Sequence, residues 1–277
     1  MVLFPNAKIN IGLNITERRN DGYHNLESIF YPVNIYDRLQ VDINTEEHAF
    51  GCTITLDGIE IEGRPEDNLV VRAYTLLAEK YNLKPVRVKL QKLIPMGAGL
   101  GGGSSDAAFM LKALNELFQL ELSDQQLETF ATRLGADCAF FIKNQPVYAT
   151  GIGNVFHYDM PIPSLSGNTL LLVKPDVFVS TRDAYSLVKP AKPSHPLIEC
   201  VNAPLSQWKG LITNDFEASV FPKFPIIQAV KEKLYLMGAT YASMSGSGSS
   251  VFGLFSHRPQ IELDNLFPDM FSVTLNL

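Results

Sequence analysis

Apolar and polar residues alternate strictly near the start of the chain, over residues 7–15. The apolar members are Ala7, Ile9, Ile11, Leu13 and Ile15, and the residues between them are Lys8, Asn10, Gly12 and Asn14. Since a period of two places successive side chains on opposite faces of a β-strand, one face is expected to be buried. The other face is either an ordinary solvated surface or the floor beneath a substrate.

Similar patterns predict further strands in the first part of the chain. Asp21 and Gly22 are typical of a hairpin turn, and residues 26–33 read as the strand that follows it. Residues 39–61 alternate like two more strands, and residues 86–93 read as another.

Helices are predicted where apolar residues recur three or four positions apart. Asn68 is placed to cap a helix that runs to about residue 81. Residues 104–120 form an amphipathic helix, and Ser123 with Gln126 makes a capping box for the next helix, which Gly135 ends.

The second half of the chain begins after a linker at residues 160–168, which is rich in proline, serine and glycine. The elements expected beyond it are a strand at 169–173, helices at 180–187, from 214 and at 225–237, and a Gly/Ser loop at 244–250 that leads into a strand at 251–255. The residues themselves indicate a mixture of α and β structure in two domains.

Composition limits the classes of function. The 277 residues are 46% hydrophobic and 19% charged, which is enough to bury a sizeable core. The formal net charge is −6 and no basic block is present, so a nucleic-acid partner is not expected. Phosphate groups must therefore be bound locally, by backbone amides and a few cations.

The cysteines and the hydropathy indicate an untargeted protein of the reducing cytoplasm. Cys52, Cys138 and Cys200 are scattered without C-x-x-C spacing, so neither a disulfide framework nor a structural zinc is expected. No stretch approaches 18 apolar residues, and the chain enters a strand by residue 7 instead of a signal core, so no membrane partner is expected.

A glycine-rich segment at residues 94–108, IPMGAGLGGGSSDAA, is the most specific feature. Five glycines lie in residues 95–105, hereafter the glycine loop, and a helix follows at once. Glycine allows the backbone to approach a ligand closely, and a helix N-terminus presents unpaired N–H groups. The segment therefore predicts a phosphate site, most simply for a nucleotide.

Other nucleotide motifs fit this loop less well. Gly97, Gly99 and Gly102 satisfy G-x-G-x-x-G, but Pro95 interrupts the strand entry and no acid-tipped second strand follows. The lysine of a Walker loop is missing, and the chain has no H-R-D or D-F-G element of protein kinases. Two serines close the loop, and they either cap the helix or hold phosphate oxygens or a metal-bound water.

Three more features carry candidate chemistry. Tyr23 and His24 stand just past the hairpin tip, where they either pack or bind a ligand. Asp137 lies between a helix end and the apolar run 138–142, where it either caps a turn or needs a cation, for which Lys8 is the obvious candidate. The late Gly/Ser loop is either a flexible turn or a second ligand loop.

Together these motifs resemble the GHMP kinases, the superfamily of galacto-, homoserine, mevalonate and phosphomevalonate kinases. The matching segments are AKINIGLNI, RRNDGYHNLES, PMGAGLGGGSSDAA, GADCAFF and MSGSGSSVFGLF, from residue 7 to about 255. The resemblance implies an α+β, two-layer α/β fold with the active site between two domains. They are an N-terminal domain like ribosomal protein S5 domain 2, residues 1–160, and a ferredoxin-like C-terminal domain, residues 161–277.

The resemblance also implies ATP-dependent phosphorylation of a substrate hydroxyl. The five segments match most closely a branch that acts on a cytidine diphosphate ester of methylerythritol, in the non-mevalonate route to isoprenoid precursors. The alternatives are another small-molecule kinase of the homoserine or mevalonate type, a dinucleotide-dependent oxidoreductase, and an inactive nucleotide-binding module. Retention of both Lys8 and Asp137 argues against the inactive module.

By the same resemblance, Asp137 is the base that accepts the proton of the attacking hydroxyl, and Lys8 keeps it ionised. The residues assigned to ATP are Asn68, Pro95, Met96, Gly97, Ala98, Gly99, Leu100, Gly101, Gly102, Gly103, Ser104 and Ser105. Those assigned to the substrate are Asn10, Tyr23, His24, Tyr185, Gly246, Ser247 and Gly248. Tyr23 and Tyr185 are expected to stack on the cytosine, and His24 to read its edge. Mg²⁺ is expected to enter with ATP and has no assigned protein ligand, and the enzyme is expected to be a monomer or a homodimer.

Overall fold

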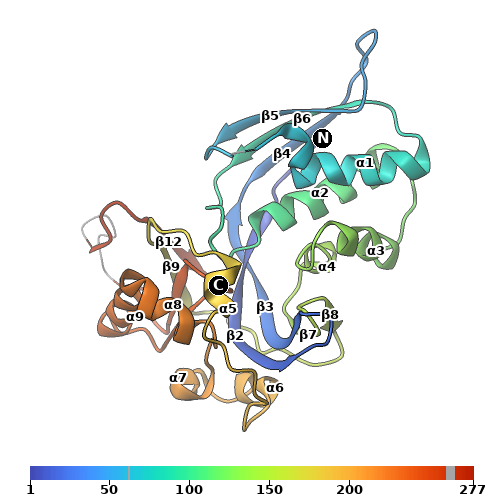
Figure 1. The fold of residues 1–277 in the computed structure, drawn as a ribbon. Coiled ribbons are helices and arrows are strands. Elements are labelled where there is room, and N and C mark those ends of the chain that lie inside the picture. The colour runs from blue at the N-terminus through green and yellow to red at the C-terminus, as the bar shows by residue number, and fades with distance from the viewer. Residues whose placement is uncertain (62, 260–265) are drawn as a thin grey trace. The chain divides into compact units, whose positions relative to one another are not determined.

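The structure, a computed structural model, describes residues 1–61, 63–259 and 266–277 and divides into two compact units that interleave along the chain (Figure 1). Unit 1 comprises Met1–Lys8, Asn34–Met96 and Gly101–Gln145. Unit 2 comprises Ile9–Val33, Gly97–Leu100 and Pro146–Leu277. The limits expected for the two family domains, residues 1–160 and 161–277, stay a prediction.

Unit 1 contains a four-stranded sheet with the order β1-β4-β6-β5. Its strands are β1 (Val2–Leu3), β4 (Arg38–Ile43), β5 (Cys52–Gly58) and β6 (Val86–Lys92). β5 and β6 are parallel, and the other pairs are antiparallel. The two strands predicted within 39–61 are β4 and β5, which end at Gly58, and the strand predicted at 86–93 is β6. Alternate residues of β6 (Val86, Val88, Leu90) are buried, as their spacing predicts.

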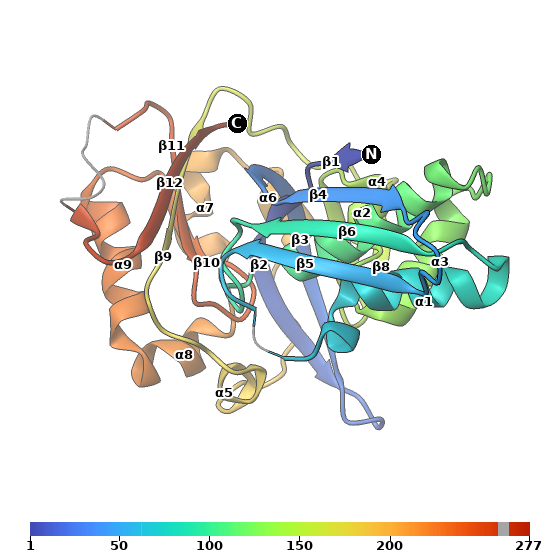
Figure 2. The ribbon, with the colours of Figure 1, turned by 90° about the horizontal axis from the view of Figure 1, so that it is seen from above.

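Helices lie on one face of this sheet, α1 and α2 against the strands and α3 and α4 beyond them, as Figures 1 and 2 show. They are α1 (Leu69–Tyr81), α2 (Gly102–Leu117), α3 (Asp124–Leu134) and α4 (Phe140–Lys143), with a 3₁₀ turn η1 at Pro65–Asp67. The predicted caps of two helices are confirmed: Asn68 accepts a hydrogen bond from Val70 N, and Ser123 with Gln126 forms a capping box.

The start of α2 differs from the prediction. The helix begins at Gly102, two residues before the expected start, and its N-cap is Gly101 with a left-handed φ of 70°. Ser104 and Ser105 therefore lie inside the first turn, and the alternative in which their hydroxyls cap the helix is wrong. Glycine is favoured at this N-cap because it adopts a positive φ without the steric cost that other residues have.

Strands β2 (Asn6–Arg18) and β3 (His24–Tyr36) begin and end in different units, and with β7 (Val147–Thr150) and β8 (Val155–His157) they form a sheet of order β2-β3-β7-β8. The predicted hairpin at Asp21 and Gly22 joins β2 to β3. Lys8 and Asn10 are only 3% and 2% exposed. A solvated polar face on residues 7–15 is therefore excluded, because both faces of this segment are covered.

A second sheet of unit 2 has the antiparallel order β10-β11-β9-β12. Its strands are β9 (Thr169–Lys174), β10 (Tyr241–Met244), β11 (Val251–Phe255) and β12 (Phe271–Asn276). The helices of this unit are α5 (Thr181–Tyr185), α6 (Leu197–Val201), α7 (Trp208–Leu211), α8 (Glu217–Lys223) and α9 (Pro225–Leu236), with a 3₁₀ turn η2 at Leu205–Gln207. Val220 of α8 and Val230 of α9 pack with Leu171 of β9 into one core. Within the described ranges, no helix has the length and apolar character needed to cross a membrane.

Candidate functional site

The structure brings Lys8 and Asp137 together within unit 1. Lys8 Nζ lies 3.5 Å from Asp137 Oδ2, and the side chains are 4% and 33% exposed respectively. Asp137 follows Gly135, the residue at which α3 ends, and precedes α4. A carboxylate that keeps one-third of its surface exposed beside a buried ammonium is available to a ligand, and this ammonium is the cation that the local sequence calls for.

An amide pair holds the strand that carries Lys8. Asn6 Nδ2 donates to Asn144 Oδ1 at 3.1 Å, and Asn144 Nδ2 donates to Asn6 Oδ1 at 2.7 Å. Asn144 is the left-handed C-cap of α4, the helix that follows Asp137. The beginning of β2 and the segment after Asp137 are therefore tied to each other by two reciprocal hydrogen bonds.

The three consecutive glycines of the loop have different surroundings. A Cβ on Gly101 would lie 3.0 Å from the Phe141 ring and 3.3 Å from Lys8 Cε, and one on Gly102 would lie 3.0 Å from Ile94 Cγ2. A Cβ on Gly103 would meet no atom within 4 Å. The first two glycines thus allow close packing, whereas the third leaves space open.

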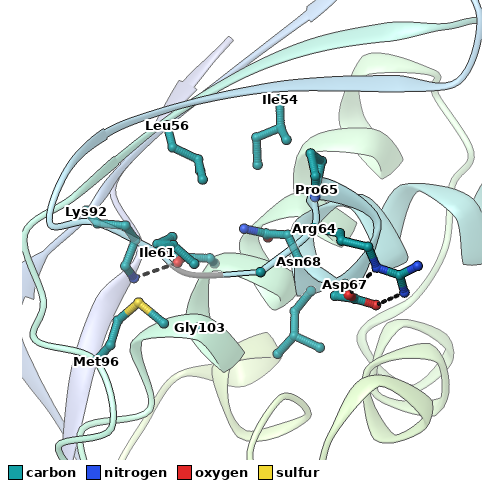
Figure 3. Close-up of a pocket in the computed structure, with 13 residues that line it drawn as sticks. Ile54, Leu56, Ile61, Arg64, Pro65, Asp67, Asn68, Lys92, Met96 and Gly103 are labelled. Atoms are coloured by element: carbon teal, nitrogen blue, oxygen red, sulfur yellow. Dashed lines mark hydrogen bonds and ion pairs between the residues drawn. The ribbon is translucent and has the colours of Figure 1, made fainter.

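That open space belongs to a cavity of about 280 Å³ within unit 1, drawn in Figure 3. The cavity is bounded by residues of β5, η1, α1, the glycine loop and α2: Ile54, Leu56, Ile61, Gly63, Arg64, Pro65, Asp67, Asn68, Leu69, Lys92, Met96, Gly103 and Asp106. Figure 3 shows Leu56 on the opposite side from Met96, and the side-chain nitrogen of Asn68 pointing into the cavity. Apolar walls with a few polar groups are typical of a small-molecule site.

A buried ionic cluster of Asp37, Lys92 and Asp106 lies beside this cavity. Lys92 Nζ donates to Asp106 Oδ2 at 2.7 Å and to Asp37 Oδ2 in a shorter contact, and none of the three side chains is more than 3% exposed. Burial raises the pKa of the Asp106 carboxyl to about 7, although the Lys92 ammonium opposes this shift. The sequence prediction missed this cluster. The sequence could have indicated it, because Lys92 falls on the same alternate positions of β6 as the buried apolar residues.

The middle of the glycine loop, residues 97–100, packs in unit 2 against the late Gly/Ser loop. Ser245 Oγ donates to Gly99 O at 2.9 Å, and a Cβ on Gly99 would lie only 2.0 Å from Ser245 O. Ser250 N also donates to Ala98 O. Glycine is therefore obligatory at position 99, where φ is 73°.

The late Gly/Ser loop is itself held tightly. Asn214 Nδ2 donates to Met244 O and to Gly246 O, both at 2.8 Å. A Cβ on Gly246 would lie 3.2 Å from Asn10 Oδ1, and one on Gly248 would lie 2.8 Å from Met244 Sδ. Gly246 and Gly248 are buried, and Ser247 between them is partly exposed. The loop is the turn between β10 and β11 and packs against residues 97–100. Its role as a second ligand loop stays a prediction.

Asn10 belongs to a second hydrogen-bonded group of unit 2. Its side-chain amide donates to Ser28 Oγ at 2.9 Å, and Ser28 Oγ donates to Gly12 O at 2.7 Å. The backbone N of Asn10 donates to Ser245 Oγ at 3.1 Å. Ser28, in β3, and Ser245, just after β10, were not among the predicted site residues, because a serine carries no local signal of its hydrogen-bond partner.

The predicted aromatic residues of unit 2 are arranged around His24. The rings of His24 and Tyr185 stack with centroids 4.8 Å apart, and Tyr185 meets Phe216 edge to face at 4.7 Å. Tyr23 is 62% exposed. Burial and the positive charge of Arg18 lower the pKa of His24, which favours the neutral ring. Stacking of a base between Tyr23 and Tyr185 stays a prediction.

Comparison with known proteins gives two family matches. The GHMP kinases N terminal domain matches residues 68–145, and the GHMP kinases C terminal domain matches residues 199–264.

Two relatives that match nearly the whole chain carry the same name. The chain is 59% identical over 263 residues to the 4-diphosphocytidyl-2-C-methyl-D-erythritol kinase of Bacteroides fragilis, with 94% of each chain covered. It is 50% identical to the protein of the same name from Parabacteroides distasonis, with 98% of this chain and 97% of the relative covered. A crystal structure of 4-(cytidine 5'-diphospho)-2C-methyl-D-erythritol kinase has a TM-score of 0.81 and 32% identity, and the match covers 100% of this chain and 99% of that one.

Proposed function

This chain belongs to the GHMP kinase family, and from that membership we propose that it phosphorylates a hydroxyl of 4-diphosphocytidyl-2-C-methyl-D-erythritol with ATP, giving the 2-phosphate and ADP. The observation that carries the proposal is the near-full-length identity to the Bacteroides fragilis kinase. The predicted family and its two-layer α+β fold are confirmed. Membership of a kinase family excludes the alternative of a dinucleotide-dependent oxidoreductase. The proposed reaction belongs to the non-mevalonate route to isoprenoid precursors.

An assay coupled to ADP formation tests the substrate. Purified enzyme is given ATP and, separately, 4-diphosphocytidyl-2-C-methyl-D-erythritol, homoserine or mevalonate. We expect turnover with the first compound alone, because homoserine and mevalonate lack the cytidine diphosphate group that would bind at one end of the substrate. Turnover of homoserine or mevalonate without turnover of the first compound would assign the chain to a different branch of the family.

Asp137 and Lys8 are proposed to carry the chemical step. The reference pKa of an aspartate, near 3.9, is too low to deprotonate an alcohol in advance, but a loose transition state needs little early deprotonation. As the bond from the hydroxyl oxygen to the γ-phosphorus forms and the bond to ADP breaks, the hydroxyl proton passes to Asp137. Lys8, whose Nζ lies 3.5 Å from Asp137 Oδ2, orients this carboxylate and offsets charge on the transferred phosphoryl group.

The cavity of unit 1 is proposed to take the base and ribose of ATP. Its apolar walls suit a flat neutral ring, and the ammonium of Lys92 is already matched by two carboxylates, so it is not a phosphate site. Gly103 borders the cavity at the N-terminus of α2. The helix N–H groups and the glycine loop would then hold the triphosphate.

Mg²⁺ is proposed to accompany ATP. No three His, Cys, Asp or Glu side chains gather as a metal site in the part of the chain that the structure describes. Ser105 Oγ, however, is buried without a hydrogen-bond partner in the first turn of α2, and a hydroxyl oxygen is a donor that Mg²⁺ accepts. Ser105 would thus offer one protein oxygen to an ion that keeps most of its phosphate and water ligands.

The cytidine end of the substrate is proposed to bind through residues of unit 2. The lowered pKa of His24 favours the neutral imidazole, which presents one donor and one acceptor to the edge of a cytosine. Tyr23, being 62% exposed, offers an aromatic face for stacking. Asn10 and the loop of Gly246, Ser247 and Gly248 are proposed to contact the rest of the substrate. We further propose a cytoplasmic enzyme, a monomer or homodimer without a nucleic-acid partner.

Asn68 provides a test of the nucleotide site, because it combines two roles that substitution can separate. Asn68→Ser keeps a capping oxygen for Val70 N but loses the side-chain amide that points into the cavity. We expect Asn68→Ser to weaken ATP binding about fivefold without lowering the melting temperature, because one ligand hydrogen bond is lost. Asn68→Ala should weaken ATP binding similarly and also cost about 1 kcal/mol of stability, because the cap is lost as well. Calorimetric titration and thermal unfolding measure the two effects, and unchanged ATP affinity in Asn68→Ser would remove this residue from the site.

A further inference from the structure

The ionic cluster of Asp37, Lys92 and Asp106 stands at both ends of the glycine loop. Lys92 is the last residue of β6, just before the loop, and Asp106 is in α2, just after it. The two residues are 14 positions apart in the sequence, yet their side chains are joined at 2.7 Å. The segment between them is the one proposed to bind the triphosphate.

We propose that Asp37, Lys92 and Asp106 are positioning residues for ATP, which fix the entrance and the exit of the glycine loop before the nucleotide binds. This inference rests on the proposed function, since it presumes that the loop receives ATP. None of the three residues needs to touch a phosphate for this role. The geometry at the two ends of the loop carries the argument.

Asp37 anchors the entrance. Its Oδ1 accepts hydrogen bonds from Leu93 N at 2.6 Å and from Ile94 N at 2.8 Å, the two residues that follow β6. The backbone N of Asp37 donates to Pro5 O, which fixes Asp37 itself. The chain leaving the sheet is therefore oriented by one buried carboxylate, whose other oxygen accepts from Lys92.

Lys92 connects this entrance to the exit. Its ammonium reaches Asp106, and Gly102 packs so closely that a Cβ there would lie 3.0 Å from Ile94 Cγ2 and 3.3 Å from Lys92 Nζ. The residues before and after the loop thus touch each other. Because the two ends of the loop are already joined, the loop loses less conformational entropy when it binds a ligand than a loop with free ends would lose.

Stability alone does not account for such a cluster. Two carboxylates and one ammonium with at most 3% exposure lose their hydration, and well-packed apolar residues commonly serve folding as well as a buried ionic group does. One oxygen of Asp106 has no hydrogen-bond partner, so the arrangement is not optimal for folding. Unlike apolar packing, directed hydrogen bonds and ion pairs fix the position of each end of the glycine loop.

Substitutions at Asp106 test this role without removing the Asp37–Lys92 pair. Asp106→Leu deletes the link at the exit, and Asp106→Asn keeps an oxygen for Lys92 in a side chain of nearly the same size. Affinity for a non-hydrolysable ATP analogue is measured by calorimetry, and the exchange of the loop amides by mass spectrometry. Glu116→Leu, at an exposed position of the same helix, is the matched control. If Asp106→Leu does not fold, Asp106→Ser, too short to reach Lys92, replaces it.

We expect Asp106→Leu to weaken analogue binding at least tenfold and to speed exchange in residues 93–105, with a larger effect on the KM for ATP than on kcat. Asp106→Asn should restore binding to within threefold of wild type. Analogue binding within twofold of wild type in Asp106→Leu, or weaker binding without faster loop exchange, overturns the inference. Because the readout is nucleotide binding, a wrong assignment of the alcohol substrate would leave this result standing.

Discussion

Replacing Asp137 with asparagine is expected to lower kcat about 10³-fold, because the amide accepts a hydrogen bond but takes no proton from the attacking hydroxyl. ATP affinity should stay within about twofold of wild type, since the residue acts on the transition state more than on bound nucleotide. The side chain keeps 33% exposure beside the buried Lys8, so the substitution changes charge and basicity with little change in packing. Steady-state kinetics with saturating ATP, together with a binding titration, measure both quantities.

The matched control is Asp159→Asn, which makes the same chemical change at an exposed position after β8. Its kcat should equal that of wild type. A second comparison uses Lys8→Met and the double variant. Because Lys8 and Asp137 are expected to act as a unit, the double variant should be about as slow as the slower single variant. A near-wild-type kcat in Asp137→Asn would exclude Asp137 as the base.

Local structure was predictable where its cause is local. The capping oxygen of Asn68 and the capping box of Ser123 and Gln126 act within three residues of themselves, so their sequence patterns predict the observed hydrogen bonds. Ser104 is also a residue type that commonly caps helices, yet the N-cap of α2 is Gly101. The difference is that the backbone at this point must adopt a positive φ against Phe141 and Lys8, a tertiary constraint that no local pattern contains.

The site was predictable in part for the same reason. An acid at the end of a helix conflicts with the helix dipole unless it caps a turn or is compensated by a cation or a ligand, and Lys8 was the candidate cation. The structure places Lys8 Nζ 3.5 Å from Asp137 Oδ2. Asp37 and Lys92 carry no such conflict. They are 55 residues apart, and each reads as an ordinary polar residue until the fold buries both. The one indication in the sequence was that Lys92 stands an even number of positions after Val88 and Leu90, and therefore on the buried face of the same strand.

Elements that depend on distant partners were missed. The strand β12 owes its existence to its full-length pairing with β9, about a hundred residues earlier in the chain. The helices α6 and α7 have five and four residues, too few to show a helical period. Their positions follow from burial of residues such as Trp208, which is 2% exposed. Tertiary packing, and not local preference, decides these segments.

Two neighbouring glycines provide the second large effect, with opposite consequences expected from the same change. Gly102→Ala should destabilise the fold by about 1–3 kcal/mol, because the new methyl group would lie 3.0 Å from Ile94 Cγ2 and 3.3 Å from Lys92 Nζ. Gly103→Ala should leave the melting temperature unchanged or raise it. Alanine favours a helix by about 0.5–1 kcal/mol over glycine, and the methyl group would meet no atom within 4 Å.

Gly103→Ala should nevertheless raise the KM for ATP about tenfold, because its methyl group occupies space beside the cavity that the nucleotide is proposed to fill. Thermal unfolding and ATP titrations of the two variants separate packing from binding. Gly102→Ala should lower the melting temperature, whereas Gly103→Ala should weaken ATP binding without lowering the melting temperature. Each variant serves as the control for the other, since both add one methyl group to the first turn of α2. An unchanged KM in Gly103→Ala would mean that ATP does not pass over this turn, and the assignment of the cavity to the nucleotide would then fail while the roles of Lys8 and Asp137 could still stand.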